Sequence, residues 1–397
     1  MTRAFSVQAG GILDSFIMQL AEEGSKPGMI SFATGLPDSS LFDLEGLAGS
    51  AREIVLRSGK EILQYGSTAG YYPLRERLAG YCRRKLGFDA SPENIILTNG
   101  SQECFDLAGR LFLNRGDLMA VENPGYLGAK QCFSAYGPEF RGADIGPGGI
   151  DVPGLEAVVK DGAALFYSIP NHQNPSGYSY SDQVRRETAS IISGSDCVMI
   201  EDDAYGELGF SGRAGRTMKS MAPDSIIFTG SFSKILSPAM RIGWMAVPDW
   251  MAGQAVKTLE ASSLQPGTLC QAIAEDYLSK TDYGAYVRRL RKVYRGKMEI
   301  FTDLMEDYLK DYVTWNIPDG GMFIWMKSPE GTDAMRIYRS CIKKGLAVMP
   351  GEPFHISGGK NTIRLNFATP SEEQMRAGMK ILRSACSESD PRARSGL

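Results

Sequence analysis

The sequence predicts an α/β protein, with a large, mostly parallel sheet covered by helices on both faces and a smaller α+β unit. Three observations predict this fold class. Between residues 94 and 247, short β-rich runs alternate with helix-length stretches, and strands connected in this way form parallel sheets. Residues 282–310 are charged, free of proline and long enough for a helix that connects two units. Beyond them, short strands and helical patterns are mixed.

The first part of the chain predicts helices and one short strand. A brief helical pattern surrounds Phe16, and residues 30–37 indicate a strand that enters a turn rich in glycine and proline. Helices are then expected at 43–57 and 73–86, the second of which has proline at its start and glycine after its end. The loop between them, residues 63–72, is rich in tyrosine and small residues.

The central strands are expected where apolar residues run together, at residues 95–97, 118–121, 164–169, 197–200, 226–229 and 242–247. Ligands of parallel sheets bind at the carboxyl ends of the strands. The residues that follow each run are therefore the first candidates for a site.

The smaller unit is expected after residue 310. It has short β-rich runs and helical patterns in alternation, with strands at 312–316, 320–326, 346–348 and 362–368 and helices at 332–344 and 371–385. The polar tail, residues 387–397, is expected to fray.

Composition excludes several function classes. The chain has 43 basic and 46 acidic residues and a net charge of −3, so it has no broad electrostatic footprint for nucleic acid or for an anionic membrane. Its seven cysteines are scattered without a CxxC pair, and with two histidines no metal-binding pattern is present. We expect reduced thiols, no metal, and a soluble, cytoplasmic protein, because no signal pattern or bilayer-length apolar run occurs.

The stretch 230–241 places one lysine among hydroxyl groups. Lys234 is flanked by Ser231 and Ser233 and stands seven residues before Arg241, a set of donors suited to holding a phosphate beside a lysine. A shielded lysine loses its proton near neutral pH and attacks a carbonyl to form a Schiff base, which is the chemistry of pyridoxal phosphate. A solvated surface cation is the ordinary alternative.

Other strand ends carry groups that suit the same cofactor. Ser101 and Gln102 enter a helix whose first amides form an anion site. Tyr126 follows the second run and is able to stack on a planar ring, and Asn174 follows the third and is able to donate to a phenolic oxygen. Each also has an ordinary structural interpretation: a helix N-cap, a core aromatic residue and a turn.

Three acids, residues 201–203, follow the fourth run. They cannot all be buried unpaired, so at least one is expected to face a cation. Asp202 is able to hold a pyridinium nitrogen protonated while Tyr205 reaches the ring oxygen, although solvated acids that cap the next turn are the alternative. The sequence contains no GxGxxG and no GxxxxGK[ST], which weakens the dinucleotide and P-loop alternatives.

In this order the motifs resemble the fold-type I pyridoxal-phosphate aminotransferases of classes I and II, most closely the 2-aminoadipate and kynurenine aminotransferase group. This group also supplies the effector domain of the MocR-type regulators. The resemblance runs from about Ile30 to Phe367. It implies an aspartate aminotransferase-like fold with a seven-stranded sheet. It also implies three segments: 1–42 in the small domain, 43–285 as the large cofactor-binding domain, and 286–397 as the rest of the small domain with the long connecting helix.

The resemblance implies a role for each candidate residue. Lys234 would carry the cofactor as an internal aldimine and then move the proton between the substrate Cα and the cofactor. Asp202 would pair with the pyridinium nitrogen, Asn174 and Tyr205 would bind the ring oxygen, and Tyr126 would stack on the ring.

The remaining roles concern the phosphate, the substrate and a second subunit. Arg364 would grip the substrate α-carboxylate, with Gly35 and Asn174 in the same pocket. Tyr65 matches a tyrosine that reaches the cofactor in the neighbouring site, which implies a homodimer. The phosphate would be held by Ser101, Gln102, Ser231, Ser233 and Arg241.

The expected function is transfer of an amino group from an α-amino acid to a 2-oxo acid, such as 2-oxoglutarate, by a ping-pong mechanism. The donor is expected to be aromatic, 2-aminoadipate-like or long and aliphatic. Met18 stands where relatives that accept acidic side chains often carry arginine, which disfavours dicarboxylates.

Two other functions are left open by the sequence. A lyase or decarboxylase is possible on the same scaffold, because the bond that breaks at Cα depends on geometry that the sequence does not specify. A MocR-like regulator is less expected, because the roughly 30 residues before the first strand are too few for a winged helix and linker.

Overall fold

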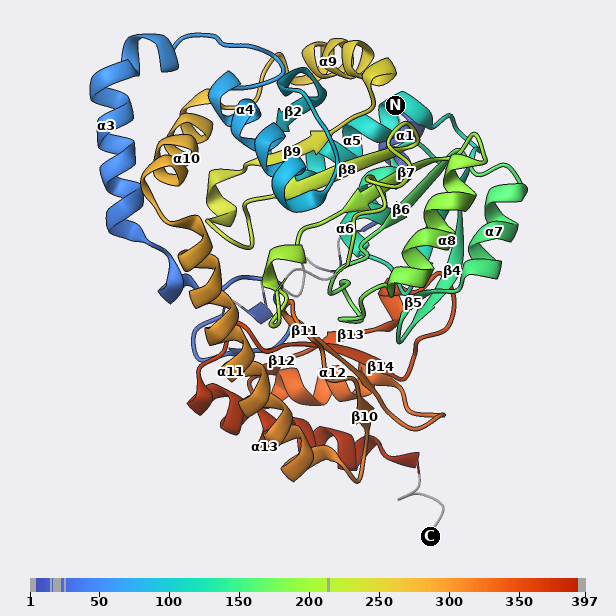
Figure 1. The fold of residues 1–397 in the computed structure, drawn as a ribbon. Coiled ribbons are helices and arrows are strands. Elements are labelled where there is room, and N and C mark those ends of the chain that lie inside the picture. The colour runs from blue at the N-terminus through green and yellow to red at the C-terminus, as the bar shows by residue number, and fades with distance from the viewer. Residues whose placement is uncertain (1–4, 15, 17–22, 25, 213–214, 392–397) are drawn as a thin grey trace, which may run out of the picture.

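The computed structural model describes residues 5–14, 16, 23–24, 26–212 and 215–391. Figure 1 shows a large domain around one twisted sheet and a smaller domain below it, with the long helix α11 (Tyr283–Leu309) running from one to the other. No helix in the described part of the chain is long and apolar enough to cross a bilayer. All seven cysteines are free, and five of them are buried.

The large sheet has the strand order β2-β9-β8-β7-β6-β3-β4-β5. Neighbours from β4 to β8 pair in parallel, whereas β9 is antiparallel to β2 and β8, and β5 is antiparallel to β4. The strands are β2 (Ile95–Thr98), β3 (Leu118–Asn123), β4 (Glu139–Gly146), β5 (Gly149–Ile150), β6 (Leu165–Ser168), β7 (Val198–Asp202), β8 (Ile226–Ser231) and β9 (Gly243–Ala246).

The sheet has eight strands, one more than the expected seven. The additional strand is the two-residue β5, which folds back on β4 and forms one edge of the sheet. Strand β4 itself has no counterpart among the apolar runs of the sequence. Only Ala143 of its eight residues is buried, so it lacks the apolar run that marks a buried strand. The six apolar runs did predict the other six strands, whose residues are largely buried.

Helices cover both faces of the large sheet, as the apolar strands predict (Figure 1). One face packs against α5 (Ser101–Phe112), α6 (Leu127–Ser134) and α9 (Asp249–Ser263). The other packs against α4 (Tyr72–Tyr81), α7 (Val152–Lys160) and α8 (Asp182–Ser193). The predicted helix 73–86 is confirmed as α4 with a π-helical turn, η2 (Cys82–Leu86), and Gly87 ends it with a φ of 77°.

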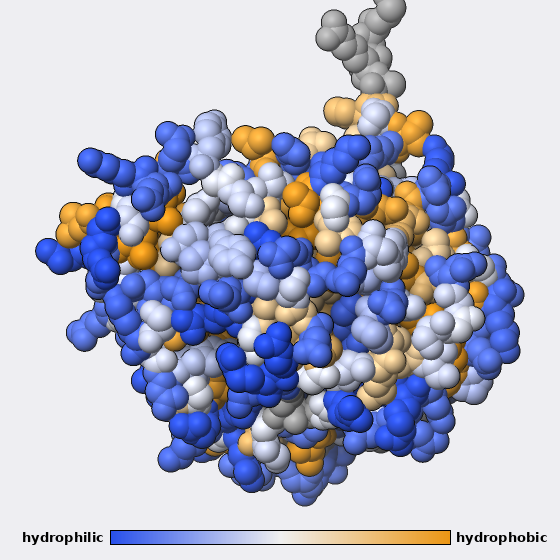
Figure 2. Space-filling view, turned by 45° about the horizontal axis from the view of Figure 1, so that its top comes forward, coloured by the Kyte–Doolittle hydropathy of each residue, from blue (hydrophilic) through white to orange (hydrophobic). Residues whose placement is uncertain are grey.

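Two further helices form the left edge of Figure 1: α3 (Leu44–Ile62) packs against α10 (Thr268–Lys280). The short helical segments of the large domain and of the chain that precedes it are α1 (Val7–Gly10), η1 (Ser39–Leu41), η3 (Pro92–Asn94), η4 (Gly206–Leu208) and η5 (Pro238–Met240). The surface is mixed in character, and in Figure 2 hydrophilic residues separate several smaller hydrophobic patches.

The smaller domain contains an antiparallel sheet of order β10-β11-β14-β13 and a parallel pair, β1 with β12. Because β1 comes from the N-terminal part of the chain and β12 from the C-terminal part, both segments build this domain, as expected. Its elements are β1 (Ile30–Ser31), β10 (Thr314–Trp315), β11 (Phe323–Lys327), α12 (Ala334–Lys343), β12 (Leu346–Ala347), β13 (Met349–Pro350), η6 (Glu352–Phe354), β14 (Thr362–Asn366) and α13 (Glu372–Ser389). Helix α13 extends four residues past the expected end at 385.

Lys130 of α6 fastens the two domains together. Its Nζ is buried and donates to the carbonyl oxygens of Pro353, Phe354 and His355 at 3.0, 2.7 and 3.3 Å. Burial lowers the pKa of this lysine to about 8. The Asn123 side chain adds a bond from the Ile356 amide at 2.9 Å, so η6 and its C-terminal neighbours are held against the large domain.

Arg185 of α8 is fully buried and fixes the loop after β6. Its guanidinium donates to the carbonyl oxygens of Tyr180 and Pro170, each at 3.0 Å, and to Asn171 Oδ1 at 2.6 Å. A buried cation needs such acceptors to offset its lost hydration. The arginine therefore holds the chain that leads directly to Asn174.

Arg185→Met is expected to lower the free energy of unfolding by about 3 kcal/mol, because buried acceptors lose their donor. Urea denaturation followed by circular dichroism measures this change. The matched control is Arg186→Met, since Arg186 is the next residue of the same helix and is exposed. Its effect should stay within about 0.5 kcal/mol. Equal losses of unfolding free energy in the two variants would contradict the role of Arg185 as a buried donor that fixes this loop.

Candidate functional site

A cavity of about 360 Å³ lies between the two domains at the carboxyl ends of the parallel strands. We call it the front cavity. Its volume falls in the range of small-molecule sites, about 300–1,000 Å³. It brings together the predicted site residues other than Tyr65, namely Gly35, Ser101, Gln102, Tyr126, Asn174, Asp202, Tyr205, Ser231, Ser233, Lys234, Arg241 and Arg364.

Tyr65 does not line this cavity in the single chain. It lies on the loop after α3, and its side chain is 78% exposed. Its expected contribution to a neighbouring subunit remains a prediction. Met18, the residue that bears on substrate choice, lies outside the described residues.

Lys234 follows β8 and points its Nζ at the carbonyl oxygen of Gly35, to which it donates at 2.8 Å. Its removal from water lowers its pKa to about 8, and the cations of Arg364 and Arg241 add to this effect. A substantial fraction of this lysine is therefore uncharged near neutral pH. Such an amine is a competent nucleophile towards a carbonyl group.

Asp202, the last residue of β7, is buried at the floor of the front cavity. Its carboxylate accepts from the Tyr167 hydroxyl at 2.6 Å and from Thr229 Oγ1 at 3.3 Å. Burial raises its pKa to about 7. A cationic group bound beside it would stabilise the charged carboxylate, so the site favours such a group.

The Asp202 contacts identify two residues that the sequence interpretation missed. Tyr167 lies on β6 and Thr229 on β8, the strands on either side of β7. Both side chains point to the same face of the sheet as Asp202. The strand order was needed to find them, because both residues lie within the apolar runs rather than after them, and neither belongs to a motif.

Arg364 is held rigidly in β14. It is 3% exposed, donates from Nη1 to Asn174 Oδ1 at 2.8 Å, and donates from Nη2 to the Ala33 carbonyl oxygen. Its guanidinium lies over the rings of Phe323 and Phe354, with centroid distances of 4.4 and 5.2 Å. Burial lowers its pKa to about 10, and its Nε has no hydrogen-bond acceptor among the described residues. A fixed, underpaired guanidinium is suited to a carboxylate.

An anion cradle forms where α5 begins. Gly100 precedes the helix with a φ of 83°, and a Cβ there would lie 2.2 Å from an Arg241 nitrogen, so glycine lets the guanidinium approach. Arg241 donates to the Asn99 carbonyl oxygen at 3.0 Å. Ser231 Oγ lines the same cradle and accepts from the Ser233 amide at 3.1 Å. Helix amides, hydroxyls and a guanidinium together form a phosphate-type site.

Gln102 takes part in this cradle in a particular way. Its side-chain amide donates to the Gly128 carbonyl oxygen at 2.8 Å, which ties α5 to α6. The backbone amides of Ser101 and Gln102 belong to the first turn of α5, where no intrahelical acceptor is available. These amides, rather than the Gln102 side chain, are placed to bind an anion.

Asn174 connects two parts of the site. Its amide donates to the Tyr205 hydroxyl at 3.5 Å, while its oxygen accepts from Arg364. Burial raises the pKa of the Tyr205 phenol, so this hydroxyl stays protonated and is able to donate. Tyr126 also lines the cavity, and burial raises its pKa as well.

The charge balance of the front cavity is positive. Lys234, Arg241 and Arg364 line it with a single carboxylate, Asp202, among the described residues. No group of three or more histidine, cysteine, aspartate or glutamate residues in the described part of the chain is placed to hold a metal. The site is therefore suited to a ligand with two anionic groups and one cationic atom.

Comparisons with known proteins agree with this geometry. The model of the family "Aminotransferase class I and II" matches residues 27–382. The chain is 34% identical to an aromatic-amino-acid aminotransferase of Thermococcus litoralis (95% of this chain, 93% of the relative). It is also 34% identical to the 2-aminoadipate transaminase of Thermus thermophilus (96% of each chain). A crystal structure of the Thermus thermophilus α-aminoadipate aminotransferase, complexed with N-(5'-phosphopyridoxyl)-L-leucine, superposes with a TM-score of 0.89 at 34% identity over 97% of each chain.

The lowered pKa of Lys234 makes its reactivity depend on pH. In the ligand-free protein, reductive labelling by a small aldehyde is expected to accelerate as the pH rises from 6 and to level off above about 8, because only the neutral amine reacts. Mass spectrometry of peptides measures the rate at each lysine. Lys257, exposed on α9, is the control lysine. Rate-against-pH profiles of the same shape for Lys234 and Lys257 would contradict the lowered pKa of Lys234.

Proposed function

The chain belongs to the class I and II aminotransferases, which depend on pyridoxal phosphate, and from this premise we propose the reaction and the residues that perform it. The enzyme moves the amino group of an aromatic, 2-aminoadipate-like or long aliphatic amino acid to a 2-oxo acid, such as 2-oxoglutarate, in a ping-pong cycle. The observation that carries this proposal is a lysine of lowered pKa in the same cavity as a fixed, underpaired arginine.

The residues of the front cavity fit pyridoxal phosphate. The cradle at the start of α5, with Ser231, Ser233 and Arg241, would hold its phosphate. Tyr126 would stack on its ring. When bound, the cofactor supplies an electron-withdrawing ring that stabilises negative charge at the substrate Cα.

The chain's own groups then divide the work around that ring. Asp202 would accept a hydrogen bond from the ring nitrogen and keep its proton in place, while Tyr167 and Thr229 orient the carboxylate. Asn174 and Tyr205 would donate to the ring oxygen. Lys234 would take the proton from the substrate Cα and pass it to the cofactor carbon that carries the amino group, and the second half of the cycle would reverse this transfer.

Arg364 sets the orientation of the substrate. Its free Nε and forked Nη groups would bind the α-carboxylate, and the two phenylalanine rings keep the guanidinium from turning. With the carboxylate fixed, the substrate Cα–H bond would be directed towards Lys234. Such an orientation would favour transamination over decarboxylation.

The side-chain pocket favours apolar substrates. Leu36, Ile169 and Met349 line the front cavity, and its basic side chains among the described residues all have a role in the scheme above. No further cation among the described residues of the cavity is therefore left for a second substrate carboxylate. This supports aromatic and long aliphatic donors ahead of dicarboxylates, while 2-oxoglutarate is able to bind through its α-carboxylate.

A homodimer is the proposed active unit. Next to Tyr65 in the chain, apolar side chains are exposed, including Leu56 at 67% and Leu63 at 66%, and a partner subunit would cover them. Both belong to α3 and the loop that follows it. A partner seated on this face would bring its own Tyr65 towards the front cavity of the neighbouring chain.

Single-turnover spectroscopy tests the proposed reaction. Phenylalanine mixed with the cofactor-loaded enzyme is expected to convert the bound cofactor to its aminated form, and a 2-oxo acid should restore it. Lys234→Ala should lower the rate by more than about 10³-fold, because both nucleophile and proton carrier are lost. Lys257→Ala is the exposed control. Release of ammonia and pyruvate from a β-substituted amino acid would indicate a lyase instead.

Mixed dimers test the role of Tyr65. Lys234→Ala and Tyr65→Ala chains are each expected to be impaired alone, but an exchanged mixture should regain about one quarter of the wild-type sites. The reason is that half of the dimers are hybrids, and each hybrid has one site with an intact lysine and an intact partner tyrosine. Steady-state activity measures the recovery. A mixture that regains nothing would mean that Tyr65 serves its own chain or none.

A further inference from the structure

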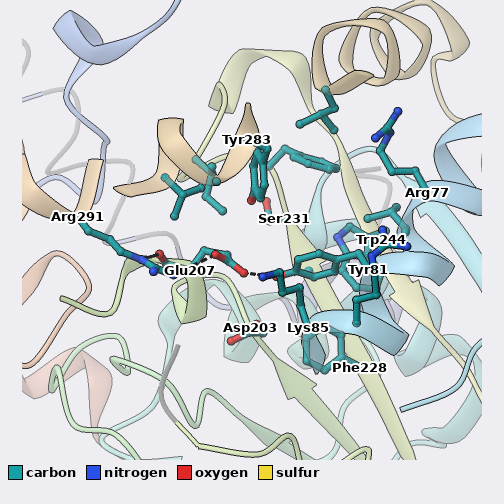
Figure 3. A pocket seen from close by; sticks show the side chains of 18 of the residues that line it. Arg77, Tyr81, Lys85, Asp203, Glu207, Phe228, Ser231, Trp244, Tyr283 and Arg291 are labelled. Carbon is teal, nitrogen blue, oxygen red and sulfur yellow. Dashed lines mark hydrogen bonds and ion pairs between the residues drawn. The ribbon is translucent and has the colours of Figure 1, made fainter. Parts of the chain in front are cut away.

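A second cavity, of about 480 Å³, is lined by Asp203 and Ile235, the chain neighbours of Asp202 and Lys234 in the front cavity. Figure 3 shows side chains that line it. We call it the back cavity. It is enclosed by α4, η4, β8 and β9 and by the adjoining parts of α10 and α11. Its volume is typical of a small-molecule site. We propose that the back cavity binds an aromatic organic anion, at a site distinct from the front cavity.

Successive residues of the same segments face the two cavities. Asp202 lines the front cavity and Asp203 the back cavity; Lys234 lines the front cavity and Ile235 the back cavity. Ser231 contributes to both. A ligand in the back cavity would therefore touch the immediate chain neighbours of Asp202 and Lys234 without entering the front cavity.

Aromatic rings form the walls of the back cavity. Phe228 and Trp244 lie with their ring centroids 5.4 Å apart, and Tyr81 meets the same indole edge-on at 6.4 Å. At position 230, a Cβ would lie 2.4 Å from the Trp244 ring, so the glycine keeps the indole against the strand and the cavity open. Flat rings gain most from walls of this kind. The interior is thus suited to an aromatic group.

The charges of the lining favour an anion. Five basic side chains line the cavity against two acids, Asp203 and Glu207, among the described residues. The basic residues are Arg77, Arg84, Lys85, Arg288 and Arg291.

Three of these cations lie beside carboxylates. Arg77 donates to Glu275 at 2.6 Å and Arg291 donates to Glu207 at 3.1 Å, and Figure 3 shows Arg77 and Arg291 on opposite sides of the cavity. Arg288 pairs with Asp282 at 3.9 Å. Arg84, Lys85 and Arg288 are exposed, and they form a positive rim that attracts an anionic group.

Occupation of the back cavity is coupled to the front cavity through β8. Ser231 reaches both cavities, and its hydroxyl accepts from the Ser233 amide in the anion cradle. A ligand that shifts Ser231 changes the affinity for whatever the cradle holds, and by reciprocity the cradle's ligand changes the affinity of the back cavity by the same factor. A ligand in the back cavity is therefore placed to regulate binding in the front cavity. The proposal does not depend on which amino acid the enzyme uses.

The probe that tests the site is 8-anilino-1-naphthalenesulfonate, an aromatic anion that fluoresces when removed from water. Titrated into the cofactor-loaded enzyme, it is expected to saturate at one molecule per chain and to bind more weakly at high salt. Leu278→Trp, which places a larger side chain in the cavity wall, should weaken binding at least about tenfold. Absence of saturable binding overturns the proposal, as does unchanged affinity in this variant.

An exposed pair of arginines provides the matched control. Arg288 lines the back cavity, whereas Arg289, the next residue of α11, is exposed and does not. Arg288→Glu should weaken probe binding about fivefold or more, and Arg289→Glu should leave it within twofold. Because both substitutions are on the surface, the comparison holds even if Leu278→Trp fails to fold. Equal effects, or competitive displacement of the probe by a substrate analogue, would assign the probe to another site.

Discussion

An excess of positive charge in one cavity is the constraint on which the rest of the structure depends. Among the residues that the structure describes, Lys234, Arg241 and Arg364 line this cavity with a single carboxylate, Asp202. Arg364 and Asp202 are buried, and Lys234 is half-buried. Such charges are stable only if each is held by dipoles or by a bound counterion. The protein supplies the dipoles: the Gly35 carbonyl for the lysine, the Asn99 carbonyl for one arginine, and the Asn174 amide oxygen and the Ala33 carbonyl for the other. The remaining imbalance is what an anionic cofactor and an anionic substrate remove.

The fold brings these groups together from distant parts of the chain. The crossover order of the large sheet sets β7 beside β8, so that Asp202 and the segment leading to Lys234 leave the sheet at the same edge. The smaller domain contributes Arg364 from β14. Pairing of Arg364 with Trp325 on one neighbouring strand and with Met349 on the other fixes its position in the sheet. Neither domain holds a complete site. The geometry of the site therefore depends on the contact between the two domains.

Much of this arrangement could be predicted from the sequence, and the reasons for the exceptions are physical. Six of the strands in the large sheet are buried almost throughout, so they stand out as apolar runs, and many of the site residues follow those runs directly. Strand β4 escaped prediction because only one of its eight residues is buried. Tyr167 and Thr229 escaped because they support Asp202 across strand pairs whose order the sequence does not reveal. The back cavity escaped for a related reason: its lining comes from helices and strands that only tertiary packing brings together.

The Lys130 contact with η6 also bears on the site. Three carbonyl oxygens of the smaller domain converge on one ammonium of the larger, and they do so next to the loop that carries Tyr126. One of these oxygens belongs to Phe354, whose ring lies under the Arg364 guanidinium. The same ammonium that joins the domains therefore also holds the residue against which Arg364 packs, so a substitution at Lys130 would disturb the cavity from outside its lining.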